Sequence, residues 1–559
     1  RLEKHSKIIP YLEKLSPVFA FPILRSCVNA RPMYLTRTTK CTYSDRHLED
    51  FDSKVDQAIL RMSGSSFSKM PGHSSIIRGI SLDRGGLGIR RLHSVKQSAW
   101  AASFLHANFA VASLYGDLTR AITLVQTRLG TFDSTLSLLR ECYPDAVCSR
   151  EVDCNLSELG TTTRLFHPDW LKAEGGEDPI LTAPTQASFN NAIDQALEVC
   201  LKEDLGEGNK LYKAWLLSSQ FQGSGSLLLP YAPRPALNLD RQHYSIHLAT
   251  RLLLPFSNHH LIQISDTANA NANTALPLRA VSLQCRFCNS SNVHMDGRFH
   301  GFNCSAMSGL RTSRHDALKS AVADLLKRLV NPNYVTIEYK PFSGAMIPKG
   351  LDVSRSNDPF KAFDIRVAFP SGGDYLLDIS VANPACTAAV AKGSDRIYNA
   401  AAIHRQVVKA NKYSSIFPAM NFDPSHFVPF VIEATGRLGP AAVNFLKSLT
   451  TLIPGSDPET VARAIRFFKR RMRYSLASFN AQIVAALSKT TRELWEPAHT
   501  SYLQNNGSGL QLLDEDDDRI DDSALHWAAY HQNDTPAAAA SASSTTSLRQ
   551  EEVSGTSEE

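Results

Sequence analysis

Three cysteines and two histidines are concentrated between residues 285 and 304 of a chain that has only 10 cysteines in 559 residues. The pair Cys285-Arg-Phe-Cys288 is typical of a turn whose two thiolates grip one metal ion, and a second pair is needed to close a tetrahedral site. His300 and Cys304 can supply that pair, with His294 as the competing fourth ligand. The alternative is that these cysteines are reduced, buried residues of apolar character. We expect zinc in a structural role, because four protein ligands leave no position for water.

Two aspartates lie on segments that alternate like β-strands. Asp364 belongs to the segment Phe363–Phe369 and Asp378 to the segment Tyr375–Ala382, with a Pro-Ser-Gly-Gly turn between them. Such alternation on both sides of a turn predicts a β-hairpin. Two carboxylates on one face of that hairpin can bind a hard cation such as Mg²⁺. The alternative is that each aspartate is solvated at the end of its strand.

The register of the hairpin decides whether the two aspartates can share a metal ion. If Phe369 pairs with Gly373 or with Tyr375, the aspartates lie opposite each other or one diagonal step apart, on one face. A tighter turn would pair Ser371 with Asp374 and would place the aspartates on opposite faces, because a slip of one residue turns a strand over. The sequence leaves both registers open.

A basic helix is expected after the hairpin. Ser394 can cap a helix that runs through Lys412, on which Arg405, Lys409 and Lys412 form one stripe. An ammonium beside a cation held by two carboxylates can orient the attacking water in phosphodiester hydrolysis. The alternative is an ordinary solvated helix face.

Further elements must position these groups. The apolar spacing after Thr312 or Ser313, either of which can be the N-cap, predicts a helix through Leu329 that packs on the following strands. Alternation predicts one more strand over Tyr334–Tyr339. A long helix is expected over Pro458–Lys489. Together these elements predict an α/β domain around the hairpin.

The first half of the long helix is strongly basic, with aromatic residues between the charges. Its basic residues are Arg463, Arg466, Lys469, Arg470, Arg471 and Arg473. Such a face can follow a phosphate backbone with an affinity that is independent of sequence and falls with salt. It can equally be a solvated face, or a nuclear-import signal around Lys469.

The order of these motifs resembles the C-terminal part of certain non-LTR retrotransposon proteins, in which the reverse transcriptase is followed by a zinc knuckle and a restriction-like endonuclease. The resemblance rests on Cys-x2-Cys, His-x3-Cys, Arg314-His315, the two aspartates, Asp378-Ile-Ser-Val-Ala-Asn-Pro and Lys409-Ala-Asn-Lys412-Tyr413. The segment Val428–Gly436 is similar to a strand and turn that follow the lysine helix in related elements. The resemblance implies a nuclease fold of the PD-(D/E)XK type that nicks target DNA to prime reverse transcription.

The resemblance also implies roles for individual residues. Asp364 and Asp378 would bind Mg²⁺, and Lys409 with its neighbour Lys412 would act beside them. The residues expected to contact nucleic acid are Arg314, His315, Arg405, Arg466, Lys469, Arg470, Arg471 and Arg473.

Three features depart from the family pattern. Phe363 stands where the family usually has proline. Ser380 replaces the lysine of the generic restriction-enzyme motif, so the positive charge must come from the helix. The gap between Cys288 and His300 is longer than the commonest form. These departures bear on activity more than on ancestry, and a protein that had lost its chemistry would remain a nucleic-acid-binding remnant.

The N-terminal half is expected to be mainly helical. Pro17–Leu35 is apolar with few breaks, and Asp45–Met62 places its apolar residues on one face, with Ser44 as a candidate cap. The glycines of Arg84-Gly-Gly-Leu-Gly-Ile-Arg90 predict a turn or a close approach of two backbone segments. This region resembles the thumb and linker that follow the polymerase palm in the same elements. No aspartate pair of the Tyr-x-Asp-Asp type is found, so we expect the polymerase core to be absent.

We therefore expect a mixed fold. Its regions are a helical thumb/linker-like region (1–100), a helical linker region (101–274), a zinc knuckle (275–310), a restriction-like endonuclease domain (311–450), a basic C-terminal helix (451–500) and a disordered acidic and Ala/Ser-rich tail (501–559). Within the linker region, helices are expected over Ala110–Leu129 and Ser188–Leu217. The tail cannot bury enough apolar area to order itself.

The composition is that of a globular protein, with 43% hydrophobic and 20% charged residues. The formal net charge of +5 is too small to indicate nucleic-acid binding by itself. Unevenly spaced cysteines, with no signal peptide and no apolar run of transmembrane length, indicate a reducing compartment. The resemblance and the basic cluster favour the nucleus, or the cytoplasm before import. The chain begins with Arg1 rather than Met, which suggests a fragment of a longer polymerase protein.

Three functions compete. The first is a retrotransposon-derived protein whose Mg²⁺-dependent endonuclease nicks target DNA, with basic surfaces for target DNA and element RNA, alone or with a separate or upstream polymerase domain. The second is a nucleic-acid-binding remnant of the same descent. The third is a host scaffold that contains zinc and uses its helices for protein contacts, and it predicts no salt-dependent affinity for nucleic acid.

Overall fold

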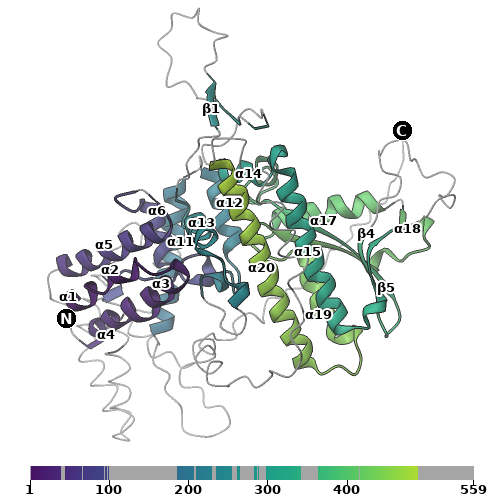
Figure 1. Ribbon diagram of the computed structural model, residues 1–559, viewed down its shortest axis with the longest axis horizontal. Helices are drawn as coiled ribbons and strands as arrows, with labels where there is room; N and C mark the ends of the chain where they lie inside the picture. Colours follow the sequence, from purple (N-terminus) through teal and green to yellow (C-terminus); the bar gives the residue numbers. More distant parts are fainter. Residues whose placement is uncertain are drawn as a thin grey trace, which may run out of the picture. The chain divides into compact units, whose positions relative to one another are not determined.

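The computed structural model describes most of the chain up to Ser488 (Figure 1). The described residues are 2–38, 45–92, 186–254, 261–264, 282–341 and 363–488, with short gaps inside several of these ranges, and a few single residues between 95 and 103. All of them belong to one compact unit, Arg1–Leu494. The helix expected over Ala110–Leu129, the competing ligand His294 and the tail expected over 501–559 lie outside the described residues.

Short helices form the N-terminal part of the fold. They are α1 (Leu2–Ser6), α2 (Ile9–Leu12), α3 (Pro17–Ile23), the π-helical turn η1 (Leu24–Val28), α4 (Ala30–Thr38), α5 (Asp45–Met62), α6 (Gly72–Gly79) and the 3-10 turn η2 (Leu82–Arg84). The helix predicted over Asp45–Met62 has those bounds, and its apolar residues Phe51 and Val55 are buried. The helical character predicted for Pro17–Leu35 is confirmed, although a π-helical turn follows the proline inside α3.

The glycine-rich segment after η2 makes the close backbone approach that the sequence predicts. Gly85 has a φ of +88°, a left-handed conformation that favours glycine. A Cβ on Gly86 would lie 2.0 Å from the carbonyl oxygen of Ile80. The guanidinium of Arg251 donates to the carbonyl oxygen of Gly86 at 2.9 Å, so this turn also contacts the end of a later helix.

A second group of helices packs on the first. It comprises α11 (Gln186–Leu205), α12 (Lys210–Ser219), η5 (Ser226–Leu228), η6 (Pro235–Leu237) and α13 (Arg241–Arg251). Apolar side chains of both groups share one core. Within this part Arg78 is buried, and its guanidinium pairs with Asp52 at 3.1 Å and with Asp56 at 2.6 Å. Because an unpaired buried charge is costly, these ion pairs hold α6 against α5.

A four-stranded sheet carries the two aspartates of the predicted hairpin. Its strands are β3 (Val335–Tyr339), β4 (Phe363–Ala368), β5 (Asp374–Ala382) and β6 (Phe427–Glu433), in the order β3-β4-β5-β6. Neighbours in β3, β4 and β5 are antiparallel, whereas β5 and β6 are parallel. A parallel pair requires a crossover, which runs through α16 (Thr387–Val390) and α17 (Ala400–Tyr413).

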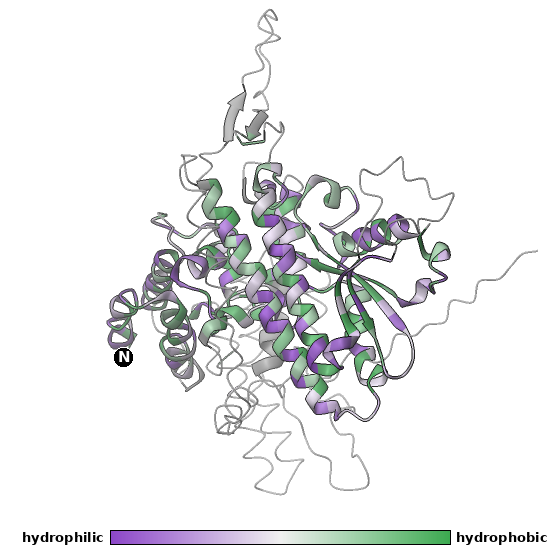
Figure 2. Cartoon of the chain, turned by 45° about the vertical axis from the view of Figure 1, so that its right-hand side comes forward, coloured by the Kyte–Doolittle hydropathy of each residue, from purple (hydrophilic) through white to green (hydrophobic). Residues whose placement is uncertain are grey.

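Helices cover both faces of this sheet. One face carries α15 (Ser308–Leu329), α19 (Pro440–Leu452) and α20 (Pro458–Ser488), and the other carries α17. On the first face, Ile365 and Phe430 belong to the shared core. On the second face, Ala401 and Ala402 of α17 pack on Val431. Burial on both sides explains the nearly continuous apolar sequence of β5 and β6, which Figure 2 shows largely in green.

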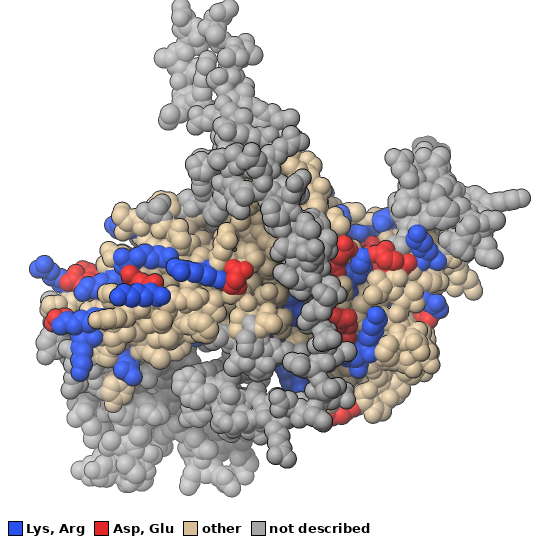
Figure 3. All heavy atoms as spheres, viewed as in Figure 1, with Lys and Arg blue, Asp and Glu red and all other residues tan. Residues whose placement is uncertain are grey.

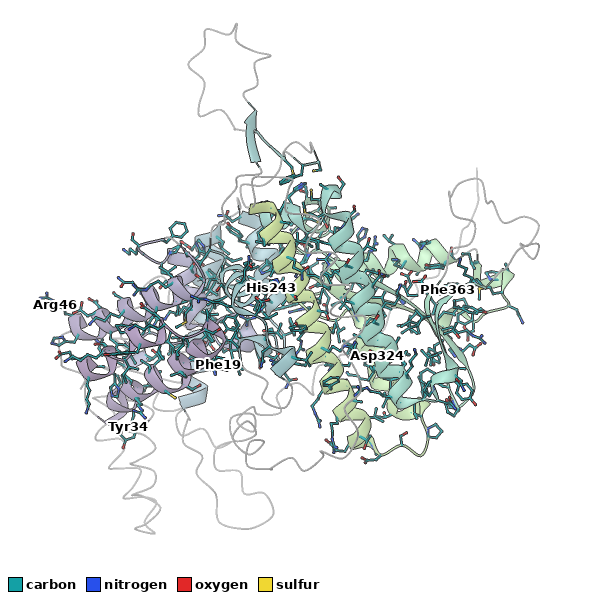
Figure 4. The ribbon with its side chains drawn as sticks, in the orientation of Figure 1. Phe19, Tyr34, Arg46, His243, Asp324 and Phe363 are labelled. Atoms are coloured by element: carbon teal, nitrogen blue, oxygen red, sulfur yellow. The ribbon has the colours of Figure 1, made fainter. Side chains whose placement is uncertain are left out.

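The long helix α20 joins the helical part to the sheet. It lies beside α15 and also contacts α13 (Figure 1). Arg471 of α20 pairs with Asp324 of α15 at 2.5 Å, and Figure 4 labels Asp324 between the two helices. The helix predicted over Pro458–Lys489 is therefore confirmed, and one of its basic residues serves this contact.

The remaining described elements are short. They are β1 (Leu261–Ile264), β2 (Ser282–Cys285), α14 (Gly297–Gly301), η8 (Ser305–Met307), η9 (Pro332–Tyr334), α18 (Ile416–Ala419) and η12 (Pro424–His426). Among the described helices, none combines the length and the apolar character needed to cross a membrane.

Two helix starts differ from the prediction. α15 begins at Ser308, ahead of the predicted caps Thr312 and Ser313. α17 begins at Ala400, and the hydroxyl of Ser394 instead donates to the carbonyl oxygen of Pro384 at 2.8 Å. A serine hydroxyl can cap a helix or bond to the carbonyl oxygen of a nearby loop. The sequence around the serine does not show which of the two bonds it makes.

Candidate metal centre and acidic site

The four residues predicted as zinc ligands form one cluster. Cys285 ends β2, which pairs with β1, and Cys288 follows in a turn. His300 lies in α14, and Cys304 directly precedes η8. The three sulfur atoms and one ring nitrogen all lie within 4.8 Å of one another. Such a set of donors can hold one tetrahedral ion such as zinc.

Hydrogen bonds within the cluster favour a thiolate, the form that binds metal, at Cys285. The Sγ atom of Cys288 lies 3.1 Å from Nε2 of His300. The hydrogen bond between Cys285 and Cys304 lowers the pKa of Cys285 and raises that of Cys304, so the two sulfur atoms share one proton. The bond to Cys285 is the main cause that raises the pKa of His300. Because thiolates rather than thiols bind metal ions, the chemistry of these donors fits zinc.

Aromatic contacts and one hydrogen bond attach the cluster to the rest of the fold. Phe299 and Phe302 are buried against Trp215, at ring-centroid distances of 5.5 Å and 5.4 Å. The side-chain amide of Asn383 donates to the carbonyl oxygen of Phe299 at 2.9 Å. Asn383 directly follows β5, so the cluster contacts both the helical core and the strand that bears Asp378.

The hairpin has a register that brings the two aspartates together. The N–H of Phe369 donates to the carbonyl oxygen of Gly373 at 3.2 Å, which is one of the two pairings that place the aspartates on one face. Gly372 completes the turn with a φ of +88°. The ladder between β4 and β5 keeps this register as far as Ile365 and Leu377. Continued by one residue, the same register places Asp364 opposite Asp378.

Asp364 has two neighbours that spacing in the sequence does not reveal. Its Oδ2 atom accepts a hydrogen bond from the N–H of Ile379 at 2.6 Å and lies 3.2 Å from Nε2 of His315. The same Nε2 atom lies 3.1 Å from the carbonyl oxygen of Ile379. Burial would raise the pKa of Asp364, but His315, the N–H of Ile379 and the charge of Lys319 together outweigh burial and lower it. The bond to Asp364 raises the pKa of His315. His315, predicted to contact nucleic acid, therefore lies against the acidic site.

Asp378 is buried between two side chains of α17. Its Oδ2 atom lies 2.5 Å from Nζ of Lys409, and its Oδ1 atom accepts a hydrogen bond from the hydroxyl of Tyr413 at 2.7 Å. Burial and the charge of Asp378 raise the pKa of Tyr413, which keeps this hydroxyl a donor. Lys412 is exposed and donates to the Tyr413 hydroxyl at 2.8 Å. Of the two lysines predicted to act at the site, Lys409 makes the direct contact.

The two sequence departures near the aspartates lie in the walls of the site. Phe363, labelled in Figure 4, is buried and stacks on Tyr413 with 4.6 Å between ring centroids. It therefore supports the ring that holds Asp378. Ser380 is also buried, and the positive charge beside Asp378 comes from Lys409 on α17.

Several residues predicted to contact nucleic acid make hydrogen bonds within the fold. Arg314 is buried, and its guanidinium donates to Oδ1 of Asn480 at 2.7 Å. Arg470 and Arg473 donate to backbone carbonyls of residues 222–229. The guanidinium groups of these three arginines already have internal acceptors, and their contact with nucleic acid stays a prediction.

The other predicted contacts are more accessible. Arg405 is exposed on α17, and Arg466 is exposed on α20, where it pairs with Glu459 at 2.5 Å. Lys469 is partly buried, and burial lowers its pKa. On the face shown in Figure 3, lysine and arginine side chains are interspersed with aspartate and glutamate. Among the described residues, that face shows no single extended basic surface.

No protein-family model matches this chain, and a search of curated proteins finds no significant match. Function must therefore be argued from the arrangement of Asp364, Asp378 and Lys409 and from the cluster of three cysteines and His300.

Proposed function

We propose that this chain is a retrotransposon-derived protein whose metal-dependent endonuclease nicks target DNA for target-primed reverse transcription. The observation that carries the proposal is the contact of Lys409 with Asp378, on the strand that pairs with the strand of Asp364. Two carboxylates and an ammonium in one place are the groups that metal-assisted phosphodiester hydrolysis uses.

The oxygen donors of this site suit Mg²⁺. Asp364 and Asp378 would hold the ion, because hard cations prefer carboxylate oxygens. Each oxygen of Asp378 has a further lone pair beyond the one that meets Lys409 or Tyr413, whereas Oδ2 of Asp364 already faces two donors. Bound Mg²⁺ would stabilise charge that develops on the phosphate and lower the pKa of its water.

The chain's own side chains would orient the reactants. Lys409 can turn its ammonium from Asp378 toward a phosphate oxygen or the attacking water. Tyr413 keeps Asp378 in place through its hydroxyl, and Phe363 fixes the ring of Tyr413. Hydrolysis adds the oxygen of water to phosphorus and breaks the phosphorus–oxygen bond to the leaving nucleotide, which takes a proton.

The other parts of the chain have supporting roles in this proposal. Zinc at the Cys285 cluster would be structural, because all four ligands are protein side chains. Arg405 is exposed on the helix that carries Lys409 and can meet the backbone of target DNA or element RNA. A separate or upstream domain would supply polymerase activity, and the reaction would take place in the nucleus.

Nicking of supercoiled plasmid by the full chain, with Mg²⁺ or EDTA, tests the proposal. Asp364→Ala and Asp378→Ala should each reduce metal-dependent nicking by about a hundredfold or more, because each removes charge stabilisation from the reacting centre. Asp374→Ala is the matched control. Asp374 begins the same strand but pairs with Arg366, away from Lys409.

Two other outcomes would contradict the proposal. Salt-dependent DNA binding without nicking, in protein that retains zinc, would favour a nucleic-acid-binding remnant. The absence of any salt-dependent affinity for DNA or RNA would favour a scaffold that contacts proteins.

A further inference from the structure

The imidazole of His315 bridges two oxygen atoms of the acidic site. Its Nε2 atom lies 3.2 Å from Oδ2 of Asp364 and 3.1 Å from the carbonyl oxygen of Ile379. One oxygen belongs to a side chain of β4 and the other to the backbone of β5. Both are acceptors that a hard cation also seeks. A ring nitrogen from α15 therefore points at the place where oxygen donors of two strands converge.

The second ring nitrogen of His315 also has a carboxylate neighbour. Its Nδ1 atom lies 3.3 Å from Oδ1 of Asp316. Histidines that bind metal ions usually donate their other ring N–H to a carboxylate or a carbonyl, which fixes the tautomer and the orientation of the ring. Asp316 can thus hold the proton on Nδ1 and leave the lone pair of Nε2 for an ion.

The backbone that carries His315 is firmly held. The preceding residue, Arg314, is buried and donates to Asn480 of α20, and Asn480 in turn donates to the carbonyl oxygen of Ala434 at 2.8 Å. One turn later Leu318 is buried in the core shared with the sheet. Rigid support of this kind keeps a ligand in position better than a loop does.

We propose that His315 is a nitrogen ligand of the catalytic ion, together with Asp364 and the carbonyl oxygen of Ile379. This inference rests on the proposed nuclease function and adds the class of ion that the site takes. Imidazole suits transition metals, whereas Mg²⁺ prefers oxygen ligands and several waters. The site accordingly binds Mn²⁺ more tightly than Mg²⁺.

Pulsed electron paramagnetic resonance of Mn²⁺ added to the zinc-loaded full chain tests this inference without measuring activity. The unaltered protein should show coupling to a directly bound nitrogen, and the coupling should change when the histidines are labelled with ¹⁵N. His315→Ala and His315→Gln should abolish the coupling and weaken Mn²⁺ binding by about tenfold or more. His404→Ala is the matched control, because His404 is an exposed histidine on α17.

The outcomes separate this inference from the proposed function. If Mn²⁺ binding depends on Asp364 but no nitrogen coupling is seen, His315 is not a ligand and the nuclease proposal stands. If both His315 variants bind Mn²⁺ as tightly as the unaltered protein, the inference also fails. If Asp364→Ala and Asp378→Ala leave Mn²⁺ binding unchanged, the inference and the proposed function fail together. His315→Gln keeps a polar side chain of similar reach, so loss of coupling in a folded variant is readily recognised.

Discussion

The Nζ atom of Lys409 lies 2.5 Å from Oδ2 of Asp378, although the lysine comes from α17 and the aspartate from β5. The side chains are only 13% and 5% exposed, so each charge depends on the other for compensation in the interior. Tyr413, from the same helix, holds the second carboxylate oxygen. The contact therefore attaches the crossover helix to the sheet at the point where the proposed chemistry takes place.

Lys409→Ala should reduce both stability and nicking. Removal of one partner of a buried ion pair leaves the other charge without compensation, which costs about 3–5 kcal/mol of unfolding free energy. Urea denaturation monitored by circular dichroism measures this loss. Lys392→Ala, which alters an exposed lysine ahead of α17, should change stability by less than about 0.5 kcal/mol. Equal stabilities of the two variants would show that the Lys409 contact does not contribute to the fold.

The cysteine cluster should contain one zinc ion that stabilises the helical core. Cys304→Ser should lose the metal and lower the melting temperature, because a structural zinc ion contributes its binding energy to folding. Elemental analysis and thermal unfolding measure the two effects. Cys27→Ser provides the control, since Cys27 is an exposed free cysteine outside the cluster. Full zinc content in Cys304→Ser would argue that Cys304 is not a ligand.

Elements with strong periodicity could be predicted from the sequence. The bounds of α5 agree with the prediction, and those of α20 and the strands β3 to β5 differ from it by one residue, because their apolar patterns repeat at 3.6 or 2 residues. The cluster of three cysteines and His300 could be predicted because its donor types and short spacing leave few other arrangements. The hairpin register could not be chosen, since the turn geometry around Gly372 decides it.

Contacts between distant elements could not be predicted. His315 was expected to meet nucleic acid, and only the packing of α15 on the sheet brings it to Asp364. In the sequence, Arg314 and Arg470 cannot be distinguished from arginines on the surface. Their hydrogen-bond acceptors come from segments far away in the chain. Charge in a sequence indicates neither which arginines find internal acceptors nor which remain available to phosphates.

The pair formed by Asp364 and His315 should give a stability that depends on pH when no divalent ion is added. The pKa of His315 is raised from 6.5, so its contribution is present below that value and is lost as the pH rises through the raised pKa. The pKa of Asp364 is lowered from 3.8, so its contribution is present above that value and is lost as the pH falls through the lowered pKa. The pair should therefore stabilise most between about pH 4 and pH 6.5.

The comparison of unaltered protein with His315→Gln measures this dependence. The difference in unfolding free energy should be larger near pH 5.5 than near pH 9. Near pH 5.5 both His315 and Asp364 are charged in the folded protein and form an ion pair. His404→Gln should show the same small difference at both pH values. A difference for His315→Gln that does not change with pH would mean that packing, not charge, is the main contribution of this ring.

Gly86→Ala should destabilise the helical part strongly. Its Cβ would lie 2.0 Å from the carbonyl oxygen of Ile80 and 2.5 Å from that of Ile77, so the backbone itself must move. Forced overpacking of this kind costs about 1–3 kcal/mol or more. Gly72→Ala should be nearly neutral, because nothing lies within 4 Å of its Cβ position. Thermal unfolding of the two variants distinguishes a required close approach from a general effect of glycine replacement.

Exposed and internal arginines should respond differently to substitution. Arg405→Gln should weaken DNA binding and reduce the slope of its salt dependence by about one, because an exposed arginine can release one counterion on meeting a phosphate. Arg470→Gln should instead lower stability, because Arg470 donates to the carbonyl oxygen of Leu229 at 3.0 Å and joins α20 to that loop. Fluorescence anisotropy at several salt concentrations and urea denaturation measure both effects for both variants. If Arg470→Gln changed the salt dependence of DNA binding but not stability, the guanidinium of Arg470 would have to be available to DNA. The separation of exposed arginines from internally bonded ones would then be wrong.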